Sequence, residues 1–141
     1  MGELEESIAG LKYDRDGLIP AVIVEAESKQ VLMVAYMNRE ALLETIRSGR
    51  THFYSRSRQK LWMKGETSGH VQEVRGVYVD CDMDTVVIEV AQRGAACHTG
   101  YYSCFYRRLN EKGQWQTVGE KVFHPEKVYG KGKKPGRDAN R

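Results

Sequence analysis

Three cysteines are the residues of this sequence with the most informative chemistry. Cys81, Cys97 and Cys104 are an odd number of cysteines, so a complete disulfide framework is not expected, and a reducing cytoplasm would keep them as thiols. Three thiolates without an evident fourth ligand describe an open zinc site, which can bind water and make it more acidic. The alternative interpretation is three small, buried, apolar side chains.

A cluster of carboxylates suggests a second metal site. Asp80, Asp82 and Asp84 lie within five residues of one another. Like charges at this spacing repel unless a cation neutralises them, and oxygen ligands suit Mg²⁺, Ca²⁺ or Mn²⁺ better than zinc. An EF-hand loop from Asp80 is excluded, because Thr85 and Ala91 stand where that loop needs Gly and Glu. A solvated acidic turn is the alternative.

Strand alternation separates Cys81 from its neighbours. In an extended segment from Val77 to Asp82, Asp80 and Asp82 lie on one face of the strand and Cys81 on the other. Cys81 would then not complete the site that the aspartates build. Its association with the two later cysteines would occur across the sheet or on another chain, and a homodimer would satisfy this geometry.

The segment from Ser55 to His70 suits a phosphorylated ligand, because it combines guanidinium, ammonium and hydroxyl groups with two glycines. A solvated basic hairpin is the alternative, and neither a Walker loop nor the zinc-deaminase signature occurs. His70 and His98 are candidate general bases, although a lone histidine is more often a hydrogen-bonded structural residue. The substrate-binding candidates are Ser55, Arg56, Ser57, Arg58, Trp62, Lys64, Glu66 and Ser68, with Trp62 as a platform for a base.

Hydrophobic patterning predicts an α+β fold, mostly antiparallel sheet with one main helix. Asn38 as N-cap and Gly49 at the end place that helix at about 39–48. Strands are expected near 19–26, 30–37, 51–55, 60–64, 71–81, 85–92 and 101–109, with a weak segment at 115–118.

Composition predicts one soluble domain in the cytoplasm. The chain has 141 residues, enough for one core, and its longest strongly apolar runs are far shorter than the roughly 20 residues of a transmembrane helix. Its N-terminus lacks the pattern of a secretory signal. Residues 127–141 carry six basic side chains and one acid, which is a net charge of +5. Because the whole chain has a net charge of +3, residues 1–126 carry −2. We therefore expect a domain over 1–126, a basic, disordered tail over 127–141, and no nucleic-acid or membrane partner.

Four ordered blocks identify a family resemblance: VLMVAYMNREAL, FYSRSRQKLWMKGETSGH, DCDMD and ACHTGYYSCFYR. Together they closely resemble phosphoribosyl-AMP cyclohydrolase of histidine biosynthesis, over about Gly17 to Arg107. The resemblance implies an intertwined homodimer with active sites at the subunit interface. It also implies one Zn²⁺ per subunit on Cys97 and Cys104 with Cys81 from the partner subunit, and one Mg²⁺ per subunit on the three aspartates.

The reaction that the resemblance implies is hydrolysis of the N1–C6 bond of the adenine ring in N1-(5-phosphoribosyl)-AMP by a zinc-activated water. The product is the formimino aminoimidazole carboxamide ribonucleotide. His98 or His70 would move the protons, and the basic segment and Mg²⁺ would bind the two phosphates. The alternatives are a zinc hydrolase or deaminase acting on another nucleotide, and a non-catalytic, zinc-stabilised nucleic-acid-binding module.

Overall fold

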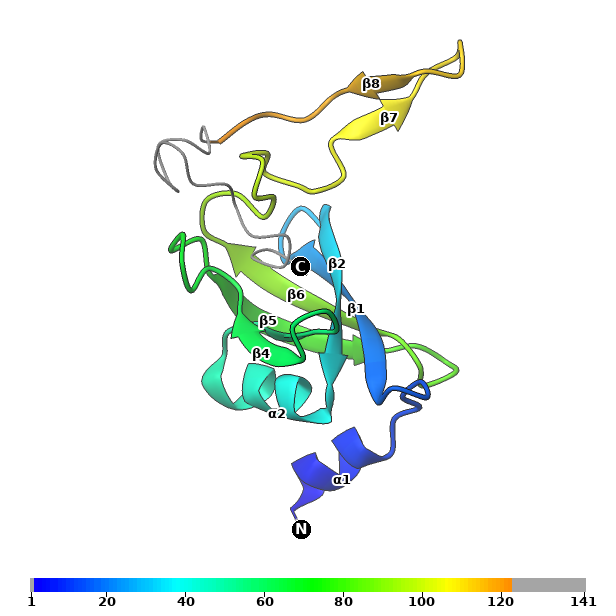
Figure 1. Cartoon of the computed structure of the whole chain (residues 1–141), viewed down its shortest axis with the longest axis vertical. Helices are drawn as coiled ribbons and strands as arrows, with labels where there is room; N and C mark the ends of the chain where they lie inside the picture. Colours follow the sequence, from blue (N-terminus) through cyan, green and yellow to red (C-terminus); the bar gives the residue numbers. More distant parts are fainter. Residues whose placement is uncertain (1, 123–141) are drawn as a thin grey trace.

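A four-stranded sheet with the order β2-β1-β6-β5 forms the centre of the computed structural model, which describes residues 2–122 (Figure 1). β1 (Leu18–Glu25) and β2 (Val31–Asn38) form one antiparallel hairpin, and β5 (Gln72–Val79) and β6 (Val86–Gln92) form another. β1 and β6 pair in parallel and join the two hairpins. The predicted α+β class with mostly antiparallel strands is confirmed, with this one parallel pair added.

The predicted main helix is α2 (Arg39–Ser48). The Asn38 side chain accepts a hydrogen bond from the Ala41 N–H at 2.8 Å, which satisfies one of the unpaired donors of the first turn. Gly49 ends the helix at φ 77°, a conformation that glycine adopts without steric cost. Its apolar face packs against β2 and β3.

A second helix, α1 (Glu3–Ala9), was not predicted. It has seven residues and no side-chain cap, so little in its local sequence favours a helix. Its stability comes from tertiary contacts: Ile8 is buried, the Tyr13 hydroxyl donates to the Ile8 carbonyl, and Glu5 pairs with Arg47 of α2.

A second, two-stranded sheet lies beside the main one. β3 (His52–Ser55) and β4 (Lys60–Met63) pair in antiparallel fashion, with Phe53 opposite Trp62. The two rings are buried, with centroids 5.1 Å apart. β3 packs against β2, so this hairpin closes one part of the core.

The expected strand over 71–81 is too long. β5 ends at Val79, and the next residues form a turn in which the Asp80 N–H and the Thr85 carbonyl pair at 3.1 Å, and the Met83 N–H and the Asp80 carbonyl at 3.0 Å. Met83 takes φ 63° there. The alternation argument for Cys81 therefore fails, because neither Cys81 nor Asp82 belongs to an extended strand.

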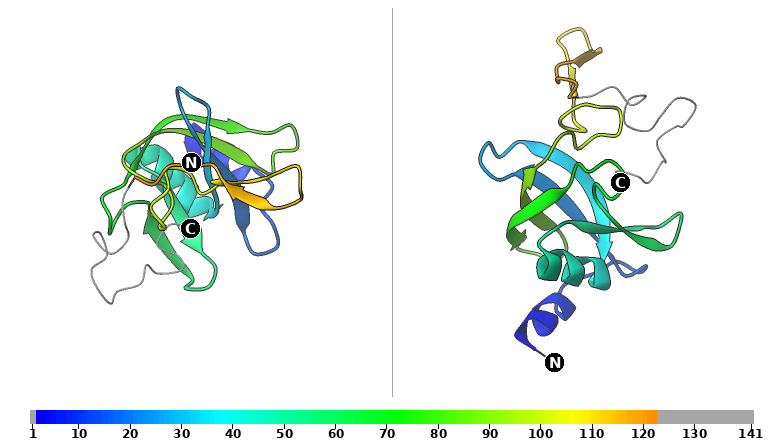
Figure 2. Two further views of the ribbon diagram at one scale, coloured as in Figure 1. Left: turned by 90° about the horizontal axis from the view of Figure 1, so that it is seen from above. Right: turned by 90° about the vertical axis from the view of Figure 1, so that its left-hand side faces the viewer.

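The expected strand over 101–109 is mostly irregular chain. Only β7 (Arg107–Leu109) is extended, and it pairs with β8 (Trp115–Thr117), the predicted weak segment. This hairpin projects away from the sheet as an arm (Figures 1 and 2). In the part of the chain described, no helix is long and apolar enough to cross a membrane. The predicted basic tail, 127–141, lies outside the described residues.

Candidate metal and nucleotide site

The loop after β6 brings two of the three cysteines together. Ala96 N–H donates to the Tyr102 carbonyl at 2.9 Å, and Cys97 N–H donates to the Tyr101 carbonyl at 3.2 Å. The far side of the loop is fixed to β2, where Cys104 N–H donates to the Leu32 carbonyl at 2.7 Å. The loop is therefore a closed turn with one cysteine on each side.

The chemistry of this pair suits a soft metal ion. Cys97 is buried, and a hydrogen bond from Cys104 lowers its thiol pKa to about 5, with smaller help from Thr99. The Cys97 sulfur lies 2.8 Å from the Thr99 hydroxyl. A thiolate at neutral pH is the form that binds zinc, so Cys97 and Cys104 fit two positions of a zinc site.

Lys64 lies beside these thiols. Its side chain is fully buried, and its Nζ donates to the Ala96 carbonyl at 2.5 Å. Burial lowers its pKa to about 7, although the charges of Cys104 and Cys97 favour the ammonium. The sequence suggested a phosphate contact or a solvated basic hairpin, whereas the structure places the Lys64 side chain inside the core next to Cys97 and Cys104.

His70 reaches the same loop from the other side. Its Nδ1 accepts a hydrogen bond from the Ala95 N–H at 3.2 Å. Burial lowers the pKa of His70, and the charge of Lys64 lowers it further. His98 follows Cys97 directly, and its charge helps to lower the Cys97 pKa. Both candidate histidines therefore lie next to the cysteine loop.

The three aspartates also come together. Their carboxylate oxygens lie within 4.8 Å of one another, and they form the only such metal-binding group found among residues 2–122. Asp80 Oδ1 accepts the N–H groups of Asp84 and Thr85 at 3.0 and 3.2 Å, which lowers the Asp80 pKa. The hydrogen bond with Asp80 raises the Asp84 pKa. Three exposed carboxylates that repel one another fit a hydrated Mg²⁺, whose charge would offset that repulsion.

Cys81 lies in this acidic turn and is exposed. The turn closes one end of the β5–β6 hairpin, and the Cys97 loop follows the other end. A strand of seven residues separates these ends by roughly 20 Å, at about 3.3 Å per residue. Within one chain, Cys97 therefore lies next to Cys104 and is separated from Cys81 by the length of the hairpin.

The matching family model is "Phosphoribosyl-AMP cyclohydrolase", over residues 33–106. The phosphoribosyl-AMP cyclohydrolase of Pelotomaculum thermopropionicum is 58% identical over 121 residues, which are 86% of this chain and 94% of that protein. The enzyme of the same name from Methanosarcina mazei is 59% identical over 119 residues, 84% of this chain and 95% of that protein. This chain belongs to the phosphoribosyl-AMP cyclohydrolase family. The predicted resemblance and the prediction of an enzyme are confirmed.

The remaining substrate-binding candidates are spread over two places. Arg56 lies 4.6 Å over the Tyr36 ring and lines a cavity of about 330 Å³ with Tyr54. In the same turn, Ser55 Oγ lies 3.3 Å from Ser57 Oγ and accepts the Arg58 N–H at 3.2 Å. This turn and cavity present a guanidinium and hydroxyls, which are groups that suit phosphate binding.

Glu66 and Ser68 belong to the tight turn that carries His70. Glu66 N–H donates to the Met63 carbonyl at 3.1 Å, and the Ser68 hydroxyl accepts the His70 N–H at 3.2 Å. Trp62, in contrast, is only 2% exposed and packs on Phe53. Its ring is not available as a platform for a base in this conformation.

Aromatic residues beside the cysteine loop form a wall that was not predicted from the sequence. A cavity of about 280 Å³ adjoins Cys104 and is lined by Phe105, Tyr106, Arg107 and Trp115. Trp115 is 70% exposed, although it is a large apolar residue. The run of two aromatic and two basic residues directly after Cys104 was the available signal, because aromatic and guanidinium groups together suit a nucleotide.

Proposed function

We propose that this protein hydrolyses the N1–C6 bond of the adenine ring in N1-(5-phosphoribosyl)-AMP, in histidine biosynthesis. The observation that carries the proposal is the Cys97–Cys104 pair, held as a thiolate site next to two histidines in a chain of this family. Substitution at N1 makes C6 electron-poor, so C6 accepts an activated water. The product is the formimino aminoimidazole carboxamide ribonucleotide.

We assign Zn²⁺ to the cysteines and Mg²⁺ to the aspartates, one of each per subunit. The lowered thiol pKa of Cys97 fits a soft ion, and the exposed carboxylates of Asp80, Asp82 and Asp84 fit a hard one. Bound zinc would supply Lewis acidity, which lowers the pKa of a water ligand. His98, beside Cys97, would accept and return protons, and Arg56 and Arg58 would bind phosphate oxygens.

We further propose a homodimer in which Cys81 of one copy completes the zinc site of the other. The separation of Cys81 from the other thiols along the β5–β6 hairpin supports this arrangement. Exposed apolar residues support it as well: Tyr78 on the edge strand is 56% exposed, and Leu109 on the arm is 52% exposed. A second copy covering these side chains would bury surface that is otherwise unfavourable in water. The three free thiols support the cytoplasm, a reducing compartment, as the proposed location of the protein.

Turnover by metal-defined protein tests the reaction. We expect about one zinc per chain after purification, and opening of the adenine ring that requires added Mg²⁺. Turnover of other adenine nucleotides but not of N1-(5-phosphoribosyl)-AMP would contradict the substrate. Zinc far below one per chain, with all three cysteines alkylated in the native protein, would contradict the metal assignment.

Mixing two inactive variants tests the shared site. Cys81→Ser and Cys97→Ser homodimers each lack one ligand in both sites. A heterodimer of the two has one site with all three thiols, so mixing after dissociation is expected to restore part of the activity. A matched mixture of Cys97→Ser with Cys104→Ser restores none, because both changes damage the same half. If native mass spectrometry shows heterodimers and the first mixture stays inactive, the shared site is wrong.

A further inference from the structure

The arm forms one wall of the cavity of about 280 Å³ beside the cysteine loop. Cys104 and Phe105 line this cavity from the loop, and Trp115 of β8 lines it from the arm, together with Arg107 of β7. Leu109 lies opposite Trp115 in the hairpin and two residues after Arg107, so all three side chains are on one face of the arm. This face therefore meets a cavity that a proposed zinc ligand also lines.

The rings around the cavity differ in what already covers them. Tyr106 stacks on Tyr101 with ring centroids 3.8 Å apart, and the Arg107 guanidinium lies 4.6 Å over the Tyr106 ring. Phe105 and Trp115, in contrast, are 58% and 70% exposed. An indole of this exposure leaves a large, flat, apolar surface in water, and such a surface marks a binding site when it borders a cavity.

The composition of this wall is complementary to a nucleotide. An indole stacks on the face of a base, and the Arg107 guanidinium adds the positive charge that a phosphate group favours. Because Cys104 lines the same cavity, a purine held against Trp115 lies beside a proposed zinc ligand. Hydrolysis of the purine ring requires this neighbourhood.

We propose that Trp115 is the platform on which the adenine ring of N1-(5-phosphoribosyl)-AMP stacks. The identity of the base rests on the proposed function. The sequence suggested this role for Trp62, which is buried against Phe53. The exposed tryptophan of the arm takes the role instead, so the arm contributes to recognition of the substrate.

The indole emission of Trp115 reports on the cavity directly. The chain has two tryptophans, and the Nε1 of buried Trp62 has no hydrogen-bond partner among residues 2–122. Trp62→Phe therefore leaves Trp115 as the reporter and breaks no hydrogen bond there. We titrate this variant, loaded with zinc, with AMP and with ribose 5-phosphate. We expect AMP to quench the emission and ribose 5-phosphate, which lacks the base, to leave it unchanged.

Two substitutions of Trp115 separate stacking from mere apolar contact, with AMP binding measured by calorimetry on the zinc-loaded protein. Trp115→Leu stays apolar but loses the ring, and we expect the Kd for AMP to rise roughly 10- to 100-fold, as removal of one stacking ring does. Trp115→Phe keeps a ring and should stay within about 5-fold of the parent. Gln116→Ala is the matched control, because the next residue of β8 points to the opposite face of the arm.

Three results would overturn the proposal. The first is AMP binding that leaves the Trp115 emission unchanged, or that Trp115→Leu does not weaken. The second is no binding of AMP at millimolar concentration. The third is an emission that changes with protein concentration and not with AMP, because the wall would then be a contact between two copies of the chain.

These results are independent of the proposed function, because AMP has no substituent at N1 and its binding needs no turnover. The proposed function fails when the parent protein does not open the ring of N1-(5-phosphoribosyl)-AMP. Thermal midpoints and native mass spectrometry verify that each variant keeps the fold and the oligomeric state of the parent. The quenching titration leaves Trp115 itself intact, so it decides the matter even where a Trp115 variant does not fold.

Discussion

The acidic turn and the cysteine loop follow opposite ends of one β-hairpin and lie in opposite environments. Asp80, Asp82 and Asp84 are exposed, and backbone N–H groups order only one of the three carboxylates. Cys97 is buried and has the charge of Lys64 beside it. Water screens the three aspartate charges, since two unit charges 4 Å apart interact by only about 1 kcal/mol in water. The buried Cys97 thiolate lacks that screening and interacts instead with the charge of Lys64.

This contrast teaches that the two groups of ligands differ in what they need before a metal binds. An exposed carboxylate cluster tolerates its own repulsion and can exchange a hydrated ion with solvent. A buried thiolate such as that of Cys97 must be charge-compensated by the fold itself, because desolvation in the core penalises every unpaired charge. We therefore expect changes in the loop to have larger consequences than changes in the turn.

Cys97→Ser should have the largest effect. It replaces the thiol whose pKa is lowered to about 5 by a hydroxyl that does not ionise at neutral pH, so zinc binding is lost and turnover falls at least on the order of 1000-fold. Elemental analysis and the ring-opening assay measure the two losses. Thr99→Ala is the control, because it removes only a neighbouring hydroxyl. Full zinc content in Cys97→Ser would contradict the assignment of this thiol.

Lys64→Met tests the buried cation in the metal-free protein. The folded-state pKa of about 7 lies below the ordinary 10.5, so folding penalises the ammonium. This penalty is complete below pH 7. It disappears as the pH rises toward 10.5, where the unfolded state also loses its proton. The stability of the parent should therefore rise with pH over this window, by roughly 5 kcal/mol at most.

Met has no charge and lacks this pH dependence. Urea unfolding of both proteins at pH 7 and pH 9.5, with chelator and reductant, measures the difference. We expect the free energy of unfolding of the variant to fall relative to that of the parent as the pH rises. Lys60→Met, an exposed position in β4, is the matched control and should follow the parent. A difference between Lys64→Met and the parent that does not change with pH would show that the lysine is not penalised by burial.

Asp82→Asn should lower turnover on the order of 10- to 100-fold at limiting Mg²⁺ and leave the thermal midpoint unchanged. The reason is that its carboxylate contributes charge to the exposed cluster, while an exposed side chain contributes little to folding. Asp80→Ala should in addition lower the midpoint, because Asp80 accepts two backbone N–H groups of the turn. Magnesium titrations of turnover and thermal unfolding separate these effects. Equal midpoints for the two variants would contradict the distinction.

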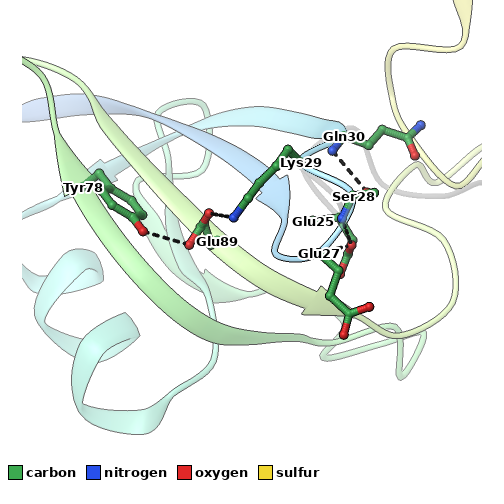
Figure 3. Close-up of polar contacts among 7 residues, drawn as sticks. All are labelled: Glu25, Glu27, Ser28, Lys29, Gln30, Tyr78 and Glu89. Atoms are coloured by element: carbon green, nitrogen blue, oxygen red, sulfur yellow. Dashed lines mark hydrogen bonds and ion pairs between the residues drawn. The ribbon is translucent and has the colours of Figure 1, made fainter.

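The smallest effect is expected for Lys29→Ala, in a third charged cluster that contains none of the proposed metal ligands. Lys29 pairs with Glu89 on β6, whose other oxygen accepts the Tyr78 hydroxyl at 3.1 Å (Figure 3). This pair is on the surface, so we expect a midpoint shift of no more than about 3 °C, smaller at high salt, with unchanged turnover. A loss of activity would show that surface charge on this face matters to the site.

The sequence by itself determined the features that depend on a few neighbouring residues. The helix α2 follows from Asn38, Gly49 and the apolar spacing between them, because capping is a local interaction. The hairpin strands follow from runs of β-branched residues between polar turns. The aspartate cluster follows from spacing alone, because three carboxylates within one short turn cannot lie far apart.

Only the tertiary structure decided what is buried and which distant segments meet. The sequence places Lys64 and Trp62 in a basic segment that we expected to be exposed. The packing of β3 and β4 against the core buries both side chains. The distance between Cys81 and Cys97 depends on where β5 ends and on the length of β6. Local patterns set the conformation of a segment, whereas the environment of a side chain is set by the elements that pack on it, and those are far away in the sequence.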